Sequence, residues 1–317
     1  MKKQLLLIGP DIKWGLGGVT IHVRRLRDYL ENKVIKYEFK DYKSSNLWAL
    51  IKSIGNTDIV HLHVSNPIYQ LILVIIGRVL RKKVVMTLHG NYGRFGKVKN
   101  WMVRQAVKMA TIPVVINNKS YKACVKLNKS TKFIPAFIPP QRVEQLPDEV
   151  KEILNRLHQE GKKIYVTNAS NVGYDKEGND IYGIDFLIQC FKDTPDKALV
   201  ISDPSGNYQK KYPNTDSNSI FFINYPHSYY EVLKRADYSI RNTSTDGDAL
   251  SVKESLYLGV PTLCTDVVDR PKGVHLFKYC DKISFEKCLL EDSDGKVEVE
   301  DGAELIVQVY KLIEDAL

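Results

Sequence analysis

Residues 241–273, RNTSTDGDALSVKESLYLGVPTLCTDVVDRPKG, contain a strand end, a polar loop, a helix and the start of another strand. The short strand-like run 238–240 precedes this stretch, and residues 242–248 form the loop. A helical apolar stripe follows, Gly259 suits the C-terminal stop of the helix, and residues 260–265 predict the next buried strand. This alternation predicts an α/β protein with parallel strands.

The start of this helix is a candidate anion site. The backbone N–H groups of residues 248–251 lack intrahelical partners and carry a partial positive charge that favours phosphate. Asp246 lies before the helix and Glu254 eight positions later, so both carboxylates can face a ligand at the helix tip. A sugar nucleotide fits this pattern, because its diphosphate would meet the helix and its hydroxyls would meet the acids. The alternative is a capped helix with an acidic first turn.

The stretch resembles the donor site of family 4 retaining glycosyltransferases, whose signature is an acid, seven residues and a Glu. The resemblance implies a GT-B fold, with two Rossmann-like domains that face each other across a cleft. Asp246 takes the place of the family's first Glu. By this resemblance Asp246 would contact the transferred sugar, Glu254 would bind the nucleotide ribose, and the diphosphate would lie on the backbone of Gly247, Asp248, Ala249 and Leu250.

A glycine-rich turn near the N-terminus is a second candidate phosphate site. Gly15, Gly17 and Gly18 follow the strand predicted at residues 5–8 and precede a helical apolar stripe. The spacing GxGG in a long loop does not match the GxGxxG turn of nicotinamide-dependent enzymes. In the family that the chain resembles, a Gly-Gly pair approaches the donor diphosphate, and the resemblance assigns Gly17 and Gly18 to this role.

Histidines follow or end two predicted strands of the first half. TDIVHLHVSNP carries His61 and His63, and KKVVMTLHGNYG carries His89 and Asn91. Ligands of open α/β sheets bind outside the carboxyl ends of the strands. The resemblance makes His89 the first choice for a catalytic contact with the sugar or acceptor, and His61, His63 and Asn91 candidates for the acceptor cleft. The alternative is that each histidine is a hydrogen-bonded polar residue at a strand end. No metal site is predicted, because no acid lies near His61 and His63.

The chain departs from the family at the two cations that contact the donor diphosphate. The family usually carries an Arg just after the first strand of the second domain and a Lys before the glycine of a later helix. Here these positions correspond to residues 168–171 and to Tyr182. Lys176, Arg241, Arg270 and Lys272 are possible substitutes. We expect Arg270 to take this role, because it follows the strand beyond the central helix.

Charge divides the chain into two parts. Residues 1–150 hold 26 Lys and Arg against 9 Asp and Glu, whereas the remainder holds 20 against 28. A basic first half favours an anionic partner such as a membrane surface, and a solvated basic surface without a partner is the alternative. A predicted amphipathic helix within residues 93–110 could lie on an anionic bilayer or pack against its own domain. Nucleic acid is not expected as a partner, because no aromatic-basic motif is present.

Cysteines and the N-terminus suggest a location for the protein. Five scattered cysteines form no disulfide framework and favour a reducing compartment, and MKKQLLLIGPD has too short an apolar run for a signal peptide. The sequence therefore predicts a cytoplasmic protein that can associate peripherally with the inner face of the cell membrane.

Together these features predict an α/β GT-B protein. Residues 1–142 form a Rossmann-like acceptor domain, residues 148–300 a Rossmann-like nucleotide-sugar domain, and residues 301–317 a helix that packs back toward the first domain. The resemblance implies a retaining, metal-independent glycosyltransferase without a cofactor, which moves a sugar from a nucleotide diphosphate donor, with UDP-sugars preferred, to a saccharide or lipid-linked saccharide in surface polysaccharide synthesis. The alternative is a degenerate relative that binds a sugar nucleotide or a partner transferase without turnover.

Overall fold

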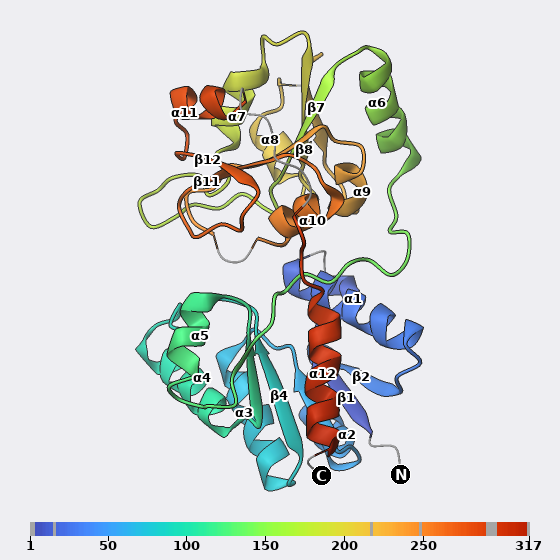
Figure 1. Cartoon of the computed structure of the whole chain (residues 1–317), viewed down its shortest axis with the longest axis vertical. Coiled ribbons are helices and arrows are strands. Elements are labelled where there is room, and N and C mark those ends of the chain that lie inside the picture. The colour runs from blue at the N-terminus through green and yellow to red at the C-terminus, as the bar shows by residue number, and fades with distance from the viewer. Residues whose placement is uncertain (1–3, 15–16, 216–217, 247–248, 290–296, 316–317) are drawn as a thin grey trace. The chain divides into compact units, whose positions relative to one another are not determined.

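The computed structural model of the chain describes residues 4–14, 17–215, 218–246, 249–289 and 297–315. The chain divides into two compact units (Figure 1). The first unit comprises Met1–Arg142 and Glu300–Leu317, and the second comprises Val143–Val299.

The first unit is built on a parallel sheet, which has six strands within the described residues in the order β2-β1-β3-β4-β5-β6. β1 pairs with β2 on one side and with β3 on the other. Every residue of β1, LLLIG, is buried, as expected of a parallel strand covered on both faces. The strands are β1 (Leu5–Gly9), β2 (Tyr37–Asp41), β3 (Ile59–Leu62), β4 (Lys83–Leu88), β5 (Ile112–Val115) and β6 (Lys132–Phe133).

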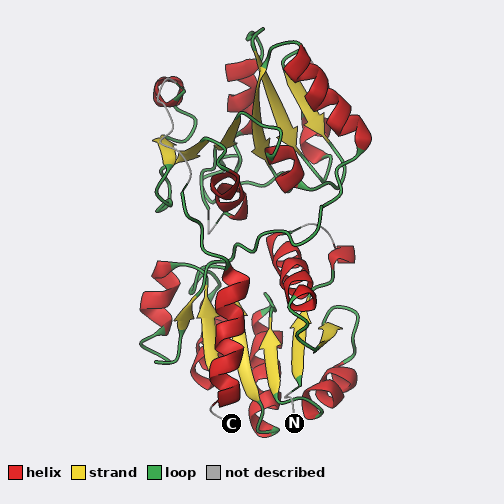
Figure 2. Ribbon diagram, turned by 45° about the vertical axis from the view of Figure 1, so that its right-hand side comes forward, coloured by secondary structure: helices red, strands yellow, loops and turns green. Residues whose placement is uncertain are grey.

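Helices cover both faces of this sheet and create two apolar cores (Figure 2). One core includes Leu50 of α2, Leu73 of α3 and Val107 of α4. The other includes Leu26 and Leu30 of α1. The helical elements are η1 (Ile12–Trp14), α1 (Gly18–Asn32), α2 (Leu47–Gly55), α3 (Pro67–Val79), α4 (Lys97–Met109), α5 (Asn118–Cys124) and α12 (Gly302–Asp315).

The C-terminal helix α12 belongs to the first unit, although it follows the second unit in sequence. Its buried side chains Ala303, Ile306, Val309, Tyr310 and Ile313 join the core formed by α1 and the sheet. Gly302 begins the helix and donates its N–H to the Phe137 carbonyl oxygen at 2.8 Å. A side chain at this position would collide with the backbone oxygens of Pro135 and Phe137, which explains the glycine. The expected return of the last helix to the first unit is confirmed.

The second unit repeats this architecture with a parallel sheet of six strands in its described part, in the order β12-β11-β10-β7-β8-β9. The strands are β7 (Lys163–Asn168), β8 (Lys197–Ser202), β9 (Ile220–Ile223), β10 (Tyr238–Arg241), β11 (Thr262–Thr265) and β12 (Val274–Phe277). The helices are α6 (Asp148–Gln159), α7 (Ile184–Phe191), α8 (Asn207–Lys211), α9 (Tyr229–Leu233), α10 (Leu250–Leu258) and α11 (Lys282–Cys288). The predicted fold class, two Rossmann-like α/β units, is confirmed.

The strand orders define one topological switch point in each sheet. In the first unit the chain moves outward from β1 through β2 on one side and through β3 to β6 on the other. In the second unit it moves from β7 through β8 and β9 on one side, and from β10 through β11 and β12 on the other. Ligands of such sheets bind outside the carboxyl ends of the strands at these points. Within the described residues, no helix combines the length and apolar character that a membrane span requires.

Candidate functional site

The switch point of the second unit holds a buried cluster of two arginines on one aspartate. Arg241 ends β10, and its Nε and Nη2 donate to the two carboxylate oxygens of Asp246 at 3.0 and 3.1 Å. Arg270 follows β11, and its Nη1 donates to Asp246 Oδ2 at 2.8 Å. The side chains of Arg241, Asp246 and Arg270 are only 12, 7 and 3% exposed. Two guanidiniums on one carboxylate leave the cluster with a net positive charge.

The protonation of Asp246 follows from these partners. Burial would raise the pKa of the Asp246 carboxyl, but the two guanidiniums, Arg241 before Arg270, outweigh burial and hold this pKa below its ordinary value. The carboxylate is therefore ionised at neutral pH. It accepts charge-assisted hydrogen bonds from both arginines, which are the stronger kind of hydrogen bond in proteins.

Arg241 connects the ends of the two central strands of this sheet. Its Nη1 donates to the Asn168 carbonyl oxygen at 3.4 Å and to Asn168 Oδ1 at 3.2 Å, so β10 is tied to the end of β7. The Tyr182 ring lies 5.3 Å from the guanidinium carbon, within the range of a cation–π contact. Asn168 begins the range 168–171, and this range and Tyr182 are where the resemblance would place the family's two cations. A guanidinium from β10 thus lies beside Asn168 and Tyr182.

Arg270, the predicted diphosphate contact, is held rigidly within this cluster. Its Nε donates to the Thr265 carbonyl oxygen at 2.9 Å, and its Nη2 lies 3.3 Å from Thr243 Oγ1. Thr265 Oγ1 in turn donates to the Thr243 carbonyl oxygen at 2.8 Å. The loop after β10, the end of β11 and the segment after β11 are therefore joined around one guanidinium.

Helix α10 begins next to this cluster, as the sequence predicts. Ala249 is its N-cap residue with an extended backbone, and the helix runs from Leu250 to Leu258. Glu254 lies inside the helix and is 4% exposed. The predicted contacts Gly247 and Asp248 lie outside the described residues. The structure thus brings Asp246, Arg270 and the start of α10 to one end of the sheet, with Arg241 at their centre.

Four histidines gather at the switch point of the first unit. His61 lies in β3, His63 follows β3, His89 follows β4, and His22 lies on α1. His63 Nδ1 lies 3.0 Å from His89 Nε2. His61 uses both ring nitrogens, with Nδ1 2.6 Å from the Tyr310 hydroxyl and Nε2 2.8 Å from Thr87 Oγ1.

Burial keeps these histidines neutral. It lowers the pKa of His22 to about 4 and that of His61 to about 3, and the neighbouring His22 imidazole adds to the effect at His61. It also lowers the pKa values of His63 and His89 well below the ordinary value. A neutral imidazole donates a hydrogen bond from one ring nitrogen and accepts one at the other. His89 can therefore act as a hydrogen-bonding group at neutral pH.

The sequence prediction did not include His22 or choose Arg241. His22 lies on the buried side of α1 between the apolar positions Val19 and Leu26, so a polar residue within an apolar stripe was the available signal. Arg241 was one of four possible cations. Its position at the end of β10 became informative only when β10 was placed beside β7.

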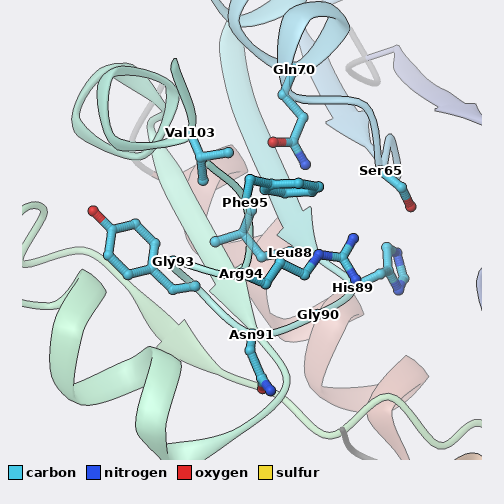
Figure 3. A pocket seen from close by; sticks show the side chains of 11 residues that line it. Ser65, Gln70, Leu88, His89, Gly90, Asn91, Gly93, Arg94, Phe95 and Val103 are labelled. Atoms are coloured by element: carbon cyan, nitrogen blue, oxygen red, sulfur yellow. The ribbon is translucent and has the colours of Figure 1, made fainter. Parts of the chain in front are cut away.

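The remaining predicted residues of the first unit lie near the same end of the sheet. Gly17 is the N-cap residue of α1 and has an extended backbone, and Gly18 is the first residue of the helix. A Cβ atom built on Gly18 would meet no heavy atom of the described chain within 4 Å. His89 and Asn91 line a small pocket with Ser65 and Arg94 (Figure 3).

Comparison with known proteins identifies the fold. No protein-family model matches the sequence. TuaC of Bacillus subtilis (strain 168), named as a teichuronic acid biosynthesis glycosyltransferase, is 26% identical over 216 residues, which cover 66% of this chain and 53% of TuaC. The match thus spans about half the length of that relative.

Solved structures are similar over almost the whole chain. HepE of Anabaena, solved with UDP and glucose, has a TM-score of 0.67 at 12% identity and covers 91% of this chain and 90% of its own. A glycosyltransferase from Rickettsia africae ESF-5 has a TM-score of 0.63 at 13% identity, and the match covers 91% of this chain and 88% of its own. Sucrose-phosphate synthase of Thermosynechococcus elongatus has a TM-score of 0.59 at 12% identity, and the match covers 91% of this chain and 89% of its own. With its two six-stranded parallel sheets in the described residues, the chain has the GT-B fold of glycosyltransferases.

Proposed function

We propose that the protein is a retaining glycosyltransferase that moves a sugar from a nucleotide diphosphate donor, with UDP-sugars preferred, to a saccharide or lipid-linked saccharide acceptor. The observation that carries this proposal is the Arg241–Asp246–Arg270 cluster at the switch point of the second unit, beside the start of α10. Similarity to HepE, solved with UDP and with UDP-glucose, supports a uridine donor. Similarity to TuaC supports a role in surface polysaccharide synthesis.

The cluster suits a donor diphosphate because of its charge and its spare donors. A guanidinium has five N–H groups. Among the described residues Arg241 makes four hydrogen bonds and Arg270 makes four, so at least one of the five N–H groups of each remains. The remaining N–H groups and the partial positive charge of the α10 N-terminus can hold diphosphate oxygens. This arrangement replaces the Arg and Lys that the resembled family uses.

Asp246 takes a modified role in this proposal. Its carboxylate orients the two guanidiniums, which makes it a positioning residue for the diphosphate as well as the candidate sugar contact. Glu254 is the candidate ribose contact and Ala249 and Leu250 the candidate backbone contacts. In the first unit, Gly17 and Gly18 are the proposed diphosphate contacts and His89 the proposed sugar contact, with His61, His63 and Asn91 as acceptor candidates.

Transfer breaks the bond between the sugar C1 and the diphosphate oxygen and forms a bond between C1 and an acceptor hydroxyl oxygen. The acceptor attacks from the face that the diphosphate leaves, so the configuration at C1 is retained. The hydroxyl proton passes to the departing diphosphate, and the nucleotide diphosphate is released. Fixed guanidinium donors stabilise the charge that develops on the leaving group, which is the usual source of most rate enhancement at such sites.

A membrane-bound acceptor fits the surface of α4. Val103, Ala106 and Val107 face the core, whereas Val98 and Trp101 are 68 and 57% exposed. The same helix carries four exposed cations, Lys97, Lys99, Arg104 and Lys108. Exposed aromatic and basic side chains on one helix are typical of attachment to an anionic bilayer. We therefore propose that the protein works at the cytoplasmic face of the cell membrane.

Nucleotide titration tests the donor site. UDP, GDP and ADP are titrated calorimetrically into the wild type, into Glu254→Ala and into the control Glu286→Ala, whose side chain is exposed on α11. We expect UDP to bind most tightly, and Glu254→Ala to lose about 1.5–3 kcal/mol of binding free energy, as for a lost hydrogen bond to a charged group. Equal UDP affinity in wild type and Glu254→Ala would contradict this assignment.

The second candidate function is sugar-nucleotide binding without turnover. The specific observation is that Asp246 engages both arginines, and that Tyr182 lies where the resembled family has a lysine. Release of UDP from UDP-sugars in the presence of membrane lipid extracts or oligosaccharides separates the two. Sustained release above the rate of the Asp246→Ala variant supports transfer, whereas nucleotide binding without release supports the binding protein.

A further inference from the structure

Three imidazoles of the first unit are arranged as ligands of a metal ion are arranged. One ring nitrogen from each of His22, His63 and His89 lies within 4.8 Å of those of the other two. Their ring centroids form a nearly equilateral triangle with sides of 4.9, 5.2 and 5.2 Å. Three imidazoles on a tetrahedral ion, with metal–nitrogen distances of about 2.0–2.1 Å, have ring centroids about 5 Å apart.

Two of these rings leave a buried nitrogen without a partner. His22 is 3% exposed and His63 is fully buried. Nε2 of each ring has no hydrogen-bond partner among the described residues. A buried polar atom in this state costs about 1–3 kcal/mol, and native proteins rarely keep one without a reason. A metal ion would account for His22 Nε2, because it binds the lone pair that hydrogen bonding leaves unused, whereas His63 would use Nδ1, the nitrogen that faces His89.

The tautomer of His22 is fixed as it is in metal-ligating histidines. His22 Nδ1 lies 2.8 Å from the Ala136 carbonyl oxygen, so Nδ1 carries the proton and donates it. The lone pair is then on Nε2, the nitrogen that has no partner among the described residues. Metal-ligating histidines almost always donate their second ring N–H to a carbonyl or carboxylate in this way.

The hydrogen bonds of the four histidines also show which of them can bind an ion. Both nitrogens of His61 are engaged by hydroxyl groups, so His61 is not a ligand. His63 Nδ1 and His89 Nε2 are 3.0 Å apart, close to the separation of about 3.3 Å between two nitrogens on one tetrahedral ion. The three ligand nitrogens lie within 4.8 Å of one another, so they would have to approach to about 3.3 Å to share an ion.

We propose that His22, His63 and His89 bind one divalent transition-metal ion of the Zn²⁺ or Co²⁺ type. Three neutral nitrogen ligands leave a fourth position for water or another small ligand. This site goes beyond the proposed glycosyl transfer, no step of which requires it. An ion bound there would engage His89, the proposed sugar contact, so metal occupancy and sugar contact would be mutually exclusive.

The site is tested with the full-length chain, without a polyhistidine tag, after dialysis against a chelator. Zn²⁺ alone is titrated calorimetrically, and Co²⁺ binding is followed by visible absorption. We expect one ion per chain with a dissociation constant in the micromolar range or below, and the intense visible bands of four-coordinate Co²⁺. Zn²⁺ binding weaker than about 100 µM, or only the pale spectrum of six-coordinate Co²⁺, would overturn the proposal.

Matched variants identify the ligands. In His22→Asn the side-chain amide can keep the hydrogen bond to the Ala136 carbonyl oxygen while the Nε2 ligand is lost. We expect it to weaken Zn²⁺ binding at least about tenfold. The control His227→Asn changes a buried histidine of the second unit, whose Nδ1 donates to the Tyr225 carbonyl oxygen at 2.7 Å, and should bind Zn²⁺ like the wild type.

Folding and nucleotide binding are measured separately. Circular dichroism and urea unfolding without metal show whether each variant is folded, and His63→Asn replaces His22→Asn if the latter is not. Zn²⁺ binding that survives both substitutions would indicate adventitious surface sites and overturn the assignment. UDP titration of the same variants reports on the second unit, so loss of the metal site is distinguishable from loss of the proposed donor site.

Discussion

Arg241 donates from Nε and Nη2 to the two carboxylate oxygens of Asp246, at 3.0 and 3.1 Å. This two-point contact fixes the plane of the guanidinium as well as its position. The same guanidinium reaches Asn168 at the end of the neighbouring strand. Asp246 thus determines where positive charge is presented at the switch point of the second unit.

Replacing Asp246 by Asn should destabilise the second unit. The amide keeps the shape of the side chain, but it leaves two buried guanidiniums without their carboxylate. Loss of one member of a buried ion pair usually costs about 3–5 kcal/mol, and we expect about 3 kcal/mol here from urea unfolding. The control Asp193→Asn changes an exposed acid and should leave the midpoint of urea unfolding unchanged. A loss below about 0.5 kcal/mol for Asp246→Asn, typical of a surface substitution, would contradict the prediction.

The contribution of Asp246 should also depend on pH. Arg241 and Arg270 hold its folded-state pKa below the ordinary 3.8 despite burial. A carboxyl with a lowered pKa stabilises the fold at pH values above the unfolded pKa, and this stabilisation is lost as the pH falls through the folded pKa. The difference in unfolding free energy between wild type and Asp246→Asn should therefore be constant above about pH 5 and narrow below about pH 4. A constant difference down to pH 3 would show that the charge of Asp246 is not responsible.

Arg241 and Arg270 should both contribute to nucleotide affinity. Arg270→Ala should weaken UDP binding several-fold, and Arg241→Lys should weaken it as well, because lysine keeps the charge but cannot reproduce a planar two-point contact. Calorimetric titration measures both effects. Arg235→Ala is the control, since Arg235 contacts Glu231 on α9 and is not part of the cluster. Unchanged UDP affinity in both cluster variants would exclude them from the donor site.

The sequence predicted the elements of the fold better than the contacts of the site. Buried runs such as LLLIG identify parallel strands locally, because both faces of each strand are covered. The contact between Arg241 and Asn168 joins residues 73 positions apart. It depends on the pairing of β10 with β7, which a local pattern does not specify. The gathering of His22, His63 and His89 depends in the same way on three different elements of the first unit.

Gly183 should be among the least replaceable residues of the second unit. It precedes α7 in a left-handed conformation with φ of 51°, which costs an alanine about 1–2 kcal/mol. A Cβ atom there would also lie 2.9 Å from Cys280 Sγ and 3.0 Å from the Tyr279 ring. Overpacking adds about 1–3 kcal/mol, so we expect Gly183→Ala to cost about 3 kcal/mol in urea unfolding.

Gly161→Ala separates the two causes. Gly161 has φ of 72°, but a Cβ atom there would meet no heavy atom of the described chain within 4 Å. Only the cost of the left-handed backbone remains, and we expect Gly161→Ala to lower the free energy of unfolding by about 1 kcal/mol. Equal losses for Gly161→Ala and Gly183→Ala would show that the crowding around Gly183 has no energetic consequence.

The exposed face of α4 should attach the protein to anionic bilayers. Trp101 and Val98 lie among four exposed cations, so binding should combine burial of apolar side chains with attraction to acidic lipids. Each Lys or Arg near such a surface contributes about 1 kcal/mol, and this attraction weakens as salt screens it. We expect co-sedimentation with vesicles that contain phosphatidylserine, little with phosphatidylcholine alone, and a several-fold loss in Trp101→Glu. Ile283→Glu, which places the same charge on an exposed apolar position of α11, should bind vesicles like the wild type. Equal losses in the two variants would mean that added negative charge, rather than the α4 surface, governs attachment.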